Sequence, residues 1–399
     1  MSAAPLSAIG ELVEPVSSWT PERDDPDGVF TYIDLSAVDQ NEKIIAGARE
    51  IACVEAPSRA RQVVRGGDIL VSTVRPNLNA VARVPSELDG ATASTGFCVL
   101  RPRAGQLDGQ YLYQWLKSPR FVGDMVRKAT GASYPAVSDR IVYESQMSLP
   151  PMPEQRRIAA ILDKADKLRA KRCAALAKLD TLTQSIFLDM FGDPDGHQWP
   201  MSTIADVAAQ IDGSIRTGPF GSQLLHSEFT EEGIAVLGID NVVDNEFRWA
   251  QRRFISEEKY RELFRYTVCP GDVLITIMGT CGRCAVVPED IPRAINTKHL
   301  CCITLDPAKC LPVFLHAYFL RHPIALRHLA QKAKGAIMEG LNMGIIRQMP
   351  IPLVPMELQV VFASRLKEVS ELRTSGHRSA MECDALFGSL QHRAFRGDL

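Results

Sequence analysis

The sequence contains two copies of one pattern, separated by a constant offset of 204 residues. A Gly-Asp-aliphatic-Leu segment occurs at 67–70 and again at 271–274, and a Pro-Met-x-x-Gln segment occurs at 151–155 and again at 355–359. Several such clusters in one register are not expected by chance. We therefore infer a tandem duplication, in which each copy folds into a similar unit.

The second copy is slightly longer than the first near its start. Ser7-Ala-Ile9 matches Ser202-Thr-Ile204 at the smaller offset of 195 residues. The segment 217–224 has no counterpart in the first copy. We therefore expect the extra residues of the second copy there.

Each copy begins with a segment of mixed character. A short apolar run that is typical of a strand follows each Gly-Asp turn, at 69–74 and 273–277. A loop, another strand and a helical stretch come next in both copies. This order indicates an α+β domain with long irregular loops, and we place the two domains at 1–150 and 193–353.

Each domain is followed by a segment with the pattern of a long helix, at 151–192 and 354–399. Prolines exclude the residues before Glu154 from the first helix, and no Gly or Pro occurs from there to Phe191. The second segment contains Ser375-Gly376, where the glycine should weaken a helix by about 1 kcal/mol relative to alanine. Apolar residues recur in the first segment at alternating spacings of three and four, at Ile158, Ile161, Ala165, Leu168, Ala175, Leu179, Leu182 and Ile186.

An isolated helix with such a stripe would expose it to water. We therefore expect the two long helices to pair antiparallel as a coiled coil that separates two globular domains related by a pseudo-two-fold axis. The alternative is that each helix packs on its own domain.

Composition limits the function without defining it. The formal net charge of −2 argues against a protein that coats nucleic acid by bulk charge, although a local basic groove remains compatible with it. No apolar run is long enough to span a membrane, and the first residues lack the features of a signal peptide. We expect a cytoplasmic protein whose ten cysteines are reduced.

The order of these segments resembles the specificity subunit of type I restriction–modification systems. The similarity is strongest in Gly-Ala-Ser-Tyr-Pro at 131–135 and in the proline-rich junction at 149–163, which continues into Glu-Gln-Arg-Arg-Ile. The second junction departs from this pattern, because 355–359 lacks the Glu-Gln pair. Further segments similar to the family lie at 67–76, 94–102, 187–192, 217–224, 271–280 and 389–399.

The resemblance implies a protein that recognises double-stranded DNA and is not itself an enzyme. Each target-recognition domain would read one half of a bipartite target, and the helix pair would fix the gap and bind two methyltransferase subunits. With these subunits the complex would methylate adenine using S-adenosylmethionine. Restriction subunits, which translocate DNA, would cleave it using ATP and Mg²⁺, and this chain would bind no cofactor. Because the copies differ, we expect two different half-sites about one DNA turn apart.

The residues expected to touch DNA are chosen by type and by position in loops. Arg reads guanine, Asn and Gln read adenine, and Lys, Arg and small polar groups bind phosphates. The alternative for each residue is a solvated loop side chain. The candidates are Arg75, Asn77, Asn79, Arg83, Ser133 and Tyr134 in the first domain, and Arg216, Thr217, Ser222, Gln223, Asn241, Arg248, Arg252, Arg283, Asn296, Lys298 and Asn342 in the second.

Two enzymatic functions and one binding function are alternatives to this hypothesis. Glycine-rich segments at 218–223 and 279–284 lack the lysine of a phosphate-binding loop. The acidic-lysine tract 257–259 resembles a nuclease motif only superficially, and after Ser256 it is better explained as the first turn of a helix. The remaining alternative is a scaffold whose duplicated domains bind protein, which the near-neutral charge mildly favours.

A zinc site is conceivable at four cysteines of the second copy. Cys281 and Cys284 have the spacing of a metal-binding pair, but Cys301 and Cys302 are adjacent. Free cysteines also pack well as small apolar residues. We favour packing and expect no metal.

Overall fold

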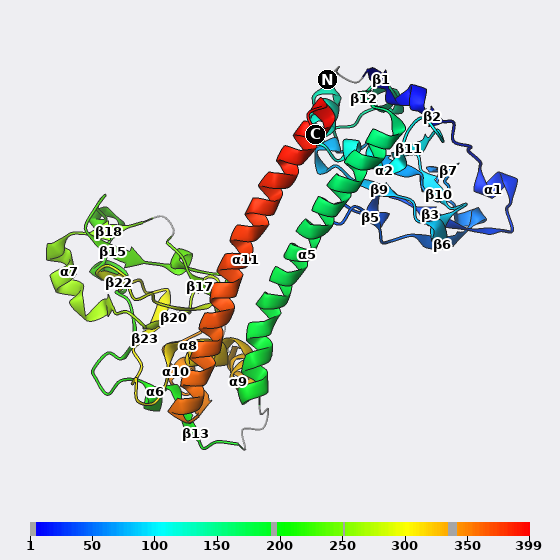
Figure 1. Cartoon of the computed structure of the whole chain (residues 1–399). Coiled ribbons are helices and arrows are strands. Elements are labelled where there is room, and N and C mark those ends of the chain that lie inside the picture. Colours follow the sequence, from blue (N-terminus) through cyan, green and yellow to red (C-terminus); the bar gives the residue numbers. More distant parts are fainter. Residues whose placement is uncertain (1–4, 193–197, 250–251, 334–340) are drawn as a thin grey trace. The chain divides into compact units, whose positions relative to one another are not determined.

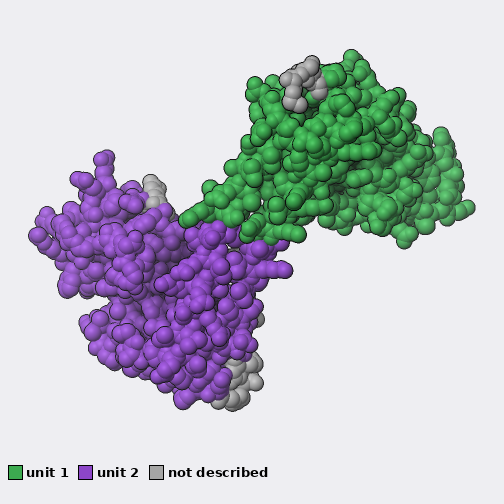
Figure 2. Space-filling view, viewed as in Figure 1, with its two compact units in different colours: residues 1–173, 378–399 green, residues 174–377 purple. Residues whose placement is uncertain are grey.

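The computed structural model describes residues 5–192, 198–249, 252–333 and 341–399 (Figure 1). The chain forms two compact units (Figure 2). Unit 1 comprises residues 1–173 and 378–399, and unit 2 comprises residues 174–377. Each unit therefore contains one copy of the mixed domain and one half of each long helix.

Unit 1 contains two four-stranded sheets and short helices. The sheets have the strand orders β2-β11-β8-β9 and β6-β3-β10-β7, and two pairs, β1-β12 and β4-β5, complete the unit. Its strands are β1 (Leu6–Ala8), β2 (Val13–Glu14), β3 (Val29–Ile33), β4 (Val38–Asp39), β5 (Ile44–Ile45), β6 (Arg49–Ala52), β7 (Ala60–Val63), β8 (Ile69–Ser72), β9 (Val81–Arg83), β10 (Thr92–Ser94), β11 (Phe97–Pro102) and β12 (Gln146–Ser148). Its helices are α1 (Pro21–Asp24), α2 (Gly109–Leu116), α3 (Pro119–Lys128), α4 (Asp139–Tyr143) and the first half of α5 (Met152–Phe191).

The sheets of unit 2 have the same strand orders. Its four-stranded sheets are β14-β23-β20-β21 and β18-β15-β22-β19, and its pairs are β13-β24 and β16-β17. The strands are β13 (Met201–Thr203), β14 (Ile215–Thr217), β15 (Ile234–Leu237), β16 (Val242–Val243), β17 (Glu246–Phe247), β18 (Phe254–Ile255), β19 (Thr267–Val268), β20 (Val273–Thr276), β21 (Cys284–Val286), β22 (Ala294–Asn296), β23 (Leu300–Ile303) and β24 (Pro350–Pro352). The helices are α6 (Ile204–Val207), α7 (Glu257–Leu263), α8 (Pro312–Arg321), α9 (Pro323–Ala333), α10 (Met343–Arg347) and the first half of α11 (Met356–Arg396).

The strand registers also repeat. Ile69 of β8 pairs with Leu100 of β11, and Val273 of β20 pairs with Ile303 of β23. In the second sheet of each unit, β3 and β10 run parallel, as do β15 and β22. The duplication and the mixed α and β character predicted from the sequence are confirmed at the level of the hydrogen-bond ladder.

The extra residues of the second copy follow α6. Val13 pairs with Pro102 in unit 1, and Ala208 forms the corresponding bridge with Leu305 in unit 2. The two copies align again at the repeat offset from β3 and β15 onward. The additional residues therefore lie between Ala208 and β15, an interval that includes the predicted segment 217–224.

The core of each unit is closed by apolar residues from both long helices. In unit 1, Leu162 of α5 and Phe395 of α11 are buried with Trp115 of α2. In unit 2, Phe187 of α5 and Phe362 of α11 are buried in the core that also contains α8. Full burial of a side chain of this size contributes about 1.5–3 kcal/mol. The end of each long helix is therefore part of the core of the unit that holds the other copy.

A buried glutamine fixes the start of each long helix. The Gln155 side chain accepts a hydrogen bond from the Asp108 backbone N–H at 2.8 Å and donates to the carbonyls of Gln106 and Pro150. Gln359 accepts from the Leu311 N–H at 2.8 Å and donates to the carbonyls of Lys309 and Val354. The two glutamines make equivalent bonds, which explains why the motif recurs although the preceding glutamate does not.

The two long helices lie against each other within each unit (Figure 1). In unit 1, the Arg169 guanidinium bonds to Asp384 of α11 at 2.6 Å and lies 4.5 Å from the centre of the Phe387 ring. In unit 2, a Cβ atom at Gly376 would lie 2.7 Å from Leu176 Cδ2. Helix α11 continues through Gly376 without interruption. The glycine expected to weaken this helix instead allows its close contact with α5.

The predicted apolar stripe is only partly correct. Ile158 is buried as expected, but Leu168 and Leu182 are 52% and 40% exposed. Leu162, which was not assigned to the stripe, is fully buried. In its first turns the helix packs on the domain core as well as on α11, so its buried face is wider there and differs from a regular seam.

Candidate nucleic-acid interface

Two loops of unit 1 bring four predicted DNA-binding residues together. The bridge between Val74 and Ala136 joins the loop after β8 to the loop before α4. Arg75 adopts a left-handed conformation with φ 51°, its backbone N–H donates to the Pro135 carbonyl at 2.7 Å, and its guanidinium lies 4.7 Å from the centre of the Tyr134 ring. The side chains of this cluster are exposed: Arg75, Asn77, Ser133 and Tyr134. We call it the Arg75–Tyr134 cluster.

The other two candidates of unit 1, Asn79 and Arg83, are not part of this cluster. The carbonyl of Asn79 accepts a hydrogen bond from Lys43 Nζ. Arg83 lies at the far end of β9, where it pairs with Ile69 in the ladder. Its Nη1 donates to Gln110 Oε1 at 3.4 Å, so it faces α2 and not the Arg75–Tyr134 cluster.

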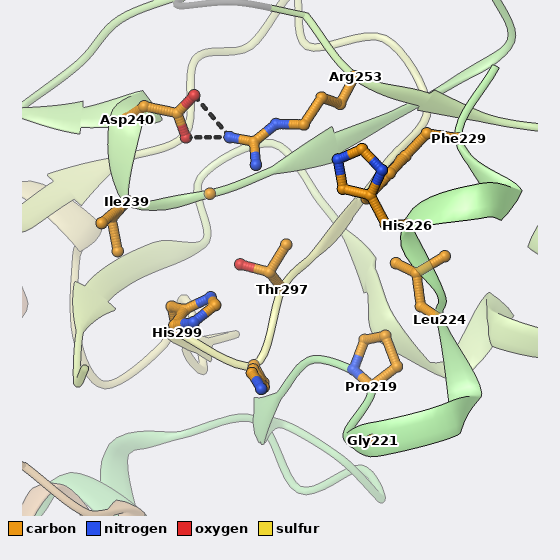
Figure 3. A pocket seen from close by; sticks show the side chains of 12 residues that line it. Pro219, Gly221, Leu224, His226, Phe229, Ile239, Asp240, Arg253, Thr297 and His299 are labelled. Carbon is orange, nitrogen blue, oxygen red and sulfur yellow. Dashed lines mark hydrogen bonds and ion pairs between the residues drawn. The ribbon is translucent and has the colours of Figure 1, made fainter. Parts of the chain in front are cut away.

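Unit 2 contains a hollow of about 360 Å³ at the corresponding end of its sheets (Figure 3). The correspondence follows from the backbone, because Thr73 N–H donates to the Gly96 carbonyl in unit 1 and Ile277 N–H donates to the His299 carbonyl in unit 2. The loop that follows β14 forms one wall, and the loops after β15 and β22 form the other. The lining residues are Pro219, Gly221, Leu224, His226, Phe229, Gly238, Ile239, Asp240, Arg253, Thr297, Lys298 and His299.

An ion pair and a histidine give the hollow its polar character. Arg253 Nη2 donates to both carboxylate oxygens of Asp240, at 2.5 and 2.6 Å. Burial, followed by the charges of Lys298 and Arg253, lowers the pKa of His299 below its usual value. The imidazole is therefore mainly neutral near pH 7.

Four of the predicted residues line this hollow or its wall loop. Lys298 lines it directly and is half-buried. Thr217 ends β14, and Ser222 is exposed on the following turn. Gln223 Oε1 accepts hydrogen bonds from the Phe220 N–H and the Tyr266 hydroxyl, which fixes the wall loop.

The remaining surface candidates of unit 2 are spread over other loops. Arg248 is exposed beside Asp244 at 3.3 Å and Glu246 at 3.6 Å. Arg252 lies over the Trp249 ring at 5.0 Å. Arg283 is half-buried before β21. Asn342 accepts the Ile345 N–H at 3.0 Å and caps α10.

Three predicted residues are inside the domain and support its frame. Arg216 is 11% exposed and bonds to Asp272 at 2.8 Å, as the pair Arg101–Asp68 does at 2.7 Å in unit 1. Asn241 is 3% exposed; it accepts from the Gly238 N–H and donates to the Arg248 carbonyl. Asn296 is fully buried and donates to the Leu300 carbonyl. We no longer assign these side chains to a DNA-binding surface.

The cysteines of the second copy pack as apolar side chains. Along β23, Cys301 and Cys302 point to opposite faces of the sheet, into different core clusters. Burial raises the pKa of Cys301 to about 12. The four cysteines cannot all converge on one ion, and among the described residues no group of metal-binding side chains occurs. At 257–259 the chain forms the start of α7, capped by Ser256, as predicted.

Four residues that define the hollow were not predicted from the sequence, namely His226, Asp240, Arg253 and His299. The duplication contains a signal for one of them. Arg253 lies 204 residues after Arg49, which also faces an acid, Asp34, at 3.5 Å. An arginine that recurs in register just before a strand could have been recognised as a candidate.

Comparisons with known proteins agree on one family. The model of the type I restriction modification DNA specificity domain matches residues 35–178 and 240–379. The specificity subunit of the Escherichia coli type I restriction enzyme EcoBI is 22% identical over 331 residues, which cover 76% of this chain and 68% of that protein. The specificity subunit of the Methanocaldococcus jannaschii enzyme MjaVIII is 23% identical over 276 residues, 67% of this chain and 64% of that protein.

Solved structures extend the similarity to the whole chain. A chain from a study of complex assembly and conformational transition of the type I restriction–modification system aligns with a TM-score of 0.69 and 25% identity, and the alignment covers 100% of this chain and 99% of that one. The HsdS subunit of Thermoanaerobacter tengcongensis aligns with a TM-score of 0.51 and 26% identity, covering 99% of this chain and 97% of that one. None of the described helices has the length and apolar character needed to cross a membrane. With two matched domains, the chain belongs to the family of type I restriction–modification DNA specificity proteins.

Proposed function

We propose that this protein is the non-catalytic DNA-recognition subunit of a type I restriction–modification complex. Each unit reads one half of a bipartite double-stranded target. The observation that carries the proposal is that two units with the same ladder present different side chains at the same end. Unit 1 presents the Arg75–Tyr134 cluster there, and unit 2 presents the hollow beside Arg253.

This difference favours two unlike half-sites. An exposed Arg on an aromatic ring suits phosphate and base-edge contacts, whereas a lined hollow with a fixed Arg suits a more specific base contact. The net charge of −2 does not conflict with this function, because DNA contacts depend on local cationic groups and not on the total charge. Arg75 lies in the cluster, and Arg253 and Lys298 line the hollow.

We further propose that α5 and α11 act together as an antiparallel coiled-coil spacer that sets the gap between the half-sites. Two contacts support this role. Arg169 bonds to Asp384 in unit 1, and Gly376 fits against Leu176 in unit 2. Since both helices also contribute to each core, a change in their register would disturb both domains.

Exposed leucines on the long helices are the proposed docking points for two methyltransferase subunits. Leu168 and Leu386 belong to unit 1, and Leu182 and Leu372 belong to unit 2; their exposed fractions lie between 40% and 58%. Leu372 and Leu386 follow Leu168 and Leu182 at the repeat offset of 204. Equivalent patches suit two copies of one partner.

The partners supply the chemistry in this proposal. The methyltransferase subunits use S-adenosylmethionine, restriction subunits use ATP and Mg²⁺, and the assembly works in the cytoplasm. This chain itself binds none of these cofactors.

Selection from a random duplex library tests the proposed function. The chain with its methyltransferase partner should enrich two short blocks separated by a fixed gap, and its affinity should fall steeply with salt as counterions are released. A scaffold that binds protein would enrich no bipartite sequence, and that result would refute the proposal.

A further inference from the structure

We propose that the hollow of unit 2 is the main specificity determinant of that domain and that Arg253 reads a guanine in the second half-site. The inference rests on the proposed function and names the residue and the base. Its geometry is that of an arginine held by an acid in a partly enclosed site.

Arg253 is held ready for such a contact. Both oxygens of Asp240 accept hydrogen bonds from the same terminal nitrogen, Nη2. The other terminal nitrogen is turned away from Asp240 and toward the interior of the hollow (Figure 3). A guanidinium has five N–H donors, and with Nη2 directed at Asp240 the two N–H groups of Nη1 face the hollow. Arginine donates to N7 and O6 of guanine in the major groove. A side chain that is already fixed loses less conformational entropy on binding.

The position of this pair depends on Gly238. A Cβ atom there would lie 2.5 Å from Asp240 Oδ1 and 2.9 Å from Arg253 Nη2. Any larger residue would push into the ion pair. The absence of a side chain at Gly238 therefore leaves room for the ion pair in this position.

Other side chains of the hollow could contact a base as well. Thr297 Oγ1 is buried and has no hydrogen-bond partner among the described residues. The neutral ring of His299 offers one donor and one acceptor. Leu224, Phe229 and Ile239 add apolar surface. Partial exclusion of water strengthens the hydrogen bonds made inside.

The first copy differs at the same place. Gly96 occupies the position of His299, and a Cβ atom on Gly96 would lie 2.8 Å from Leu35 Cδ1, so Leu35 fills this space. Arg49, the counterpart of Arg253, is 61% exposed and 3.5 Å from Asp34. Arg253 is 38% exposed and bound closely to its acid, so the positioned arginine is a property of the second copy. It should affect the second half-site alone.

The test is library selection with the full chain bound to its methyltransferase partner, using the wild type, Arg253→Ala, Arg253→Lys and the control Arg261→Ala. Arg261 is an exposed arginine on α7 of the same unit. The lysine variant keeps the charge but loses the planar fork. Thermal unfolding of each variant shows whether the fold is intact.

We expect the wild type to require guanine at one position of one block. Both Arg253 variants should lower that preference about tenfold or more and leave the other positions unchanged. Arg261→Ala should keep the full preference. The inference is overturned if Arg253→Ala weakens binding to all sequences alike, as loss of a phosphate contact would, or if Arg253→Lys keeps the guanine preference. If the wild type selects no bipartite site, the proposed function itself fails.

Discussion

The two copies bury an ion pair at the same place but build it from different strands. In unit 1, Asp68 accepts hydrogen bonds from Arg101 of β11. In unit 2, Asp272 takes the place of Asp68, but Thr304 donates to it from the position of Arg101, and the guanidinium comes from Arg216 of β14. Both domains thus keep a buried carboxylate that is neutralised by a guanidinium, but the arginine that supplies the guanidinium lies on a different strand in each.

At the two junctions, by contrast, the buried hydrogen-bonding residue itself is retained. There the glutamines Gln155 and Gln359 keep identical bonds, whereas Glu154 is replaced by Leu358. Glu154 is exposed in part, and among the described residues its ion pair is with Arg157 on the same helix. The retained residue is the one whose polar atoms are buried.

The largest expected effect concerns the buried ion pair. Asp272→Ala should destabilise unit 2 by about 3–5 kcal/mol, because it leaves the Arg216 charge buried and unpaired. Asp68→Ala should do the same in unit 1. Denaturant unfolding measures both, with Asp24→Ala at the exposed pair with Arg23 as a control that should cost much less. Losses no larger than that of the control would show that the buried pair does not support the domain.

The junction comparison predicts the next largest effect. Gln155→Ala and Gln359→Ala should each cost about 1–3 kcal/mol, since buried backbone groups lose their partners. Glu154→Ala should cost less than about 1 kcal/mol, since its partner is solvated. Equal losses in the three variants, measured by thermal unfolding, would mean that burial does not explain which residue recurs.

Two glycines of α11 separate helix propensity from helix packing. A Cβ atom at Gly388 would meet nothing within 4 Å, so Gly388→Ala should stabilise the protein by up to about 1 kcal/mol. At Gly376 the added methyl group meets Leu176, and Gly376→Ala should give no such gain. An equal increase in melting temperature for both variants would argue against close contact of the long helices at Gly376.

The smallest effect concerns an ion pair of unit 1 whose two positions hold an arginine and a serine in unit 2. Lys117 pairs with Asp166 in unit 1, but in unit 2 Arg321 and Ser370, which follow them at offset 204, line a hollow of about 560 Å³. Ser370→Asp should stabilise unit 2 by about 0.5 kcal/mol at low salt by forming an ion pair with Arg321. Ser370→Asn, which introduces a side chain of the same shape as aspartate but without its charge, should not. A gain that persists in 1 M salt, or appears equally with asparagine, would exclude an ion pair as its cause.

Much of the fold could be predicted because it produces repeated patterns in the sequence. The repeat offset gave the two domains, and the proline-free stretch after Glu154 gave the long helix. The buried face of that helix was less predictable, because contacts with the domain core decide it as much as contacts with the partner helix. Leu168 and Leu182, both on the predicted stripe, are exposed.

The site residues were harder to predict, because residue type and loop position do not report burial. Arg216, Asn241 and Asn296 have the side chains expected of a DNA contact, yet each satisfies a buried group of its own domain. Arg253 has the same chemistry but faces a hollow, which forms only when loops distant in sequence meet.

The central claim is that the two units read different halves of one target. Library selection with Tyr134→Ala and with Arg253→Ala, each in the complex with the methyltransferase partner, tests it most directly. We predict that the first substitution alters the preferences of one block only and the second alters those of the other block only. If either substitution changed both blocks, or if both changed the same block, the assignment of one half-site to each unit would be contradicted.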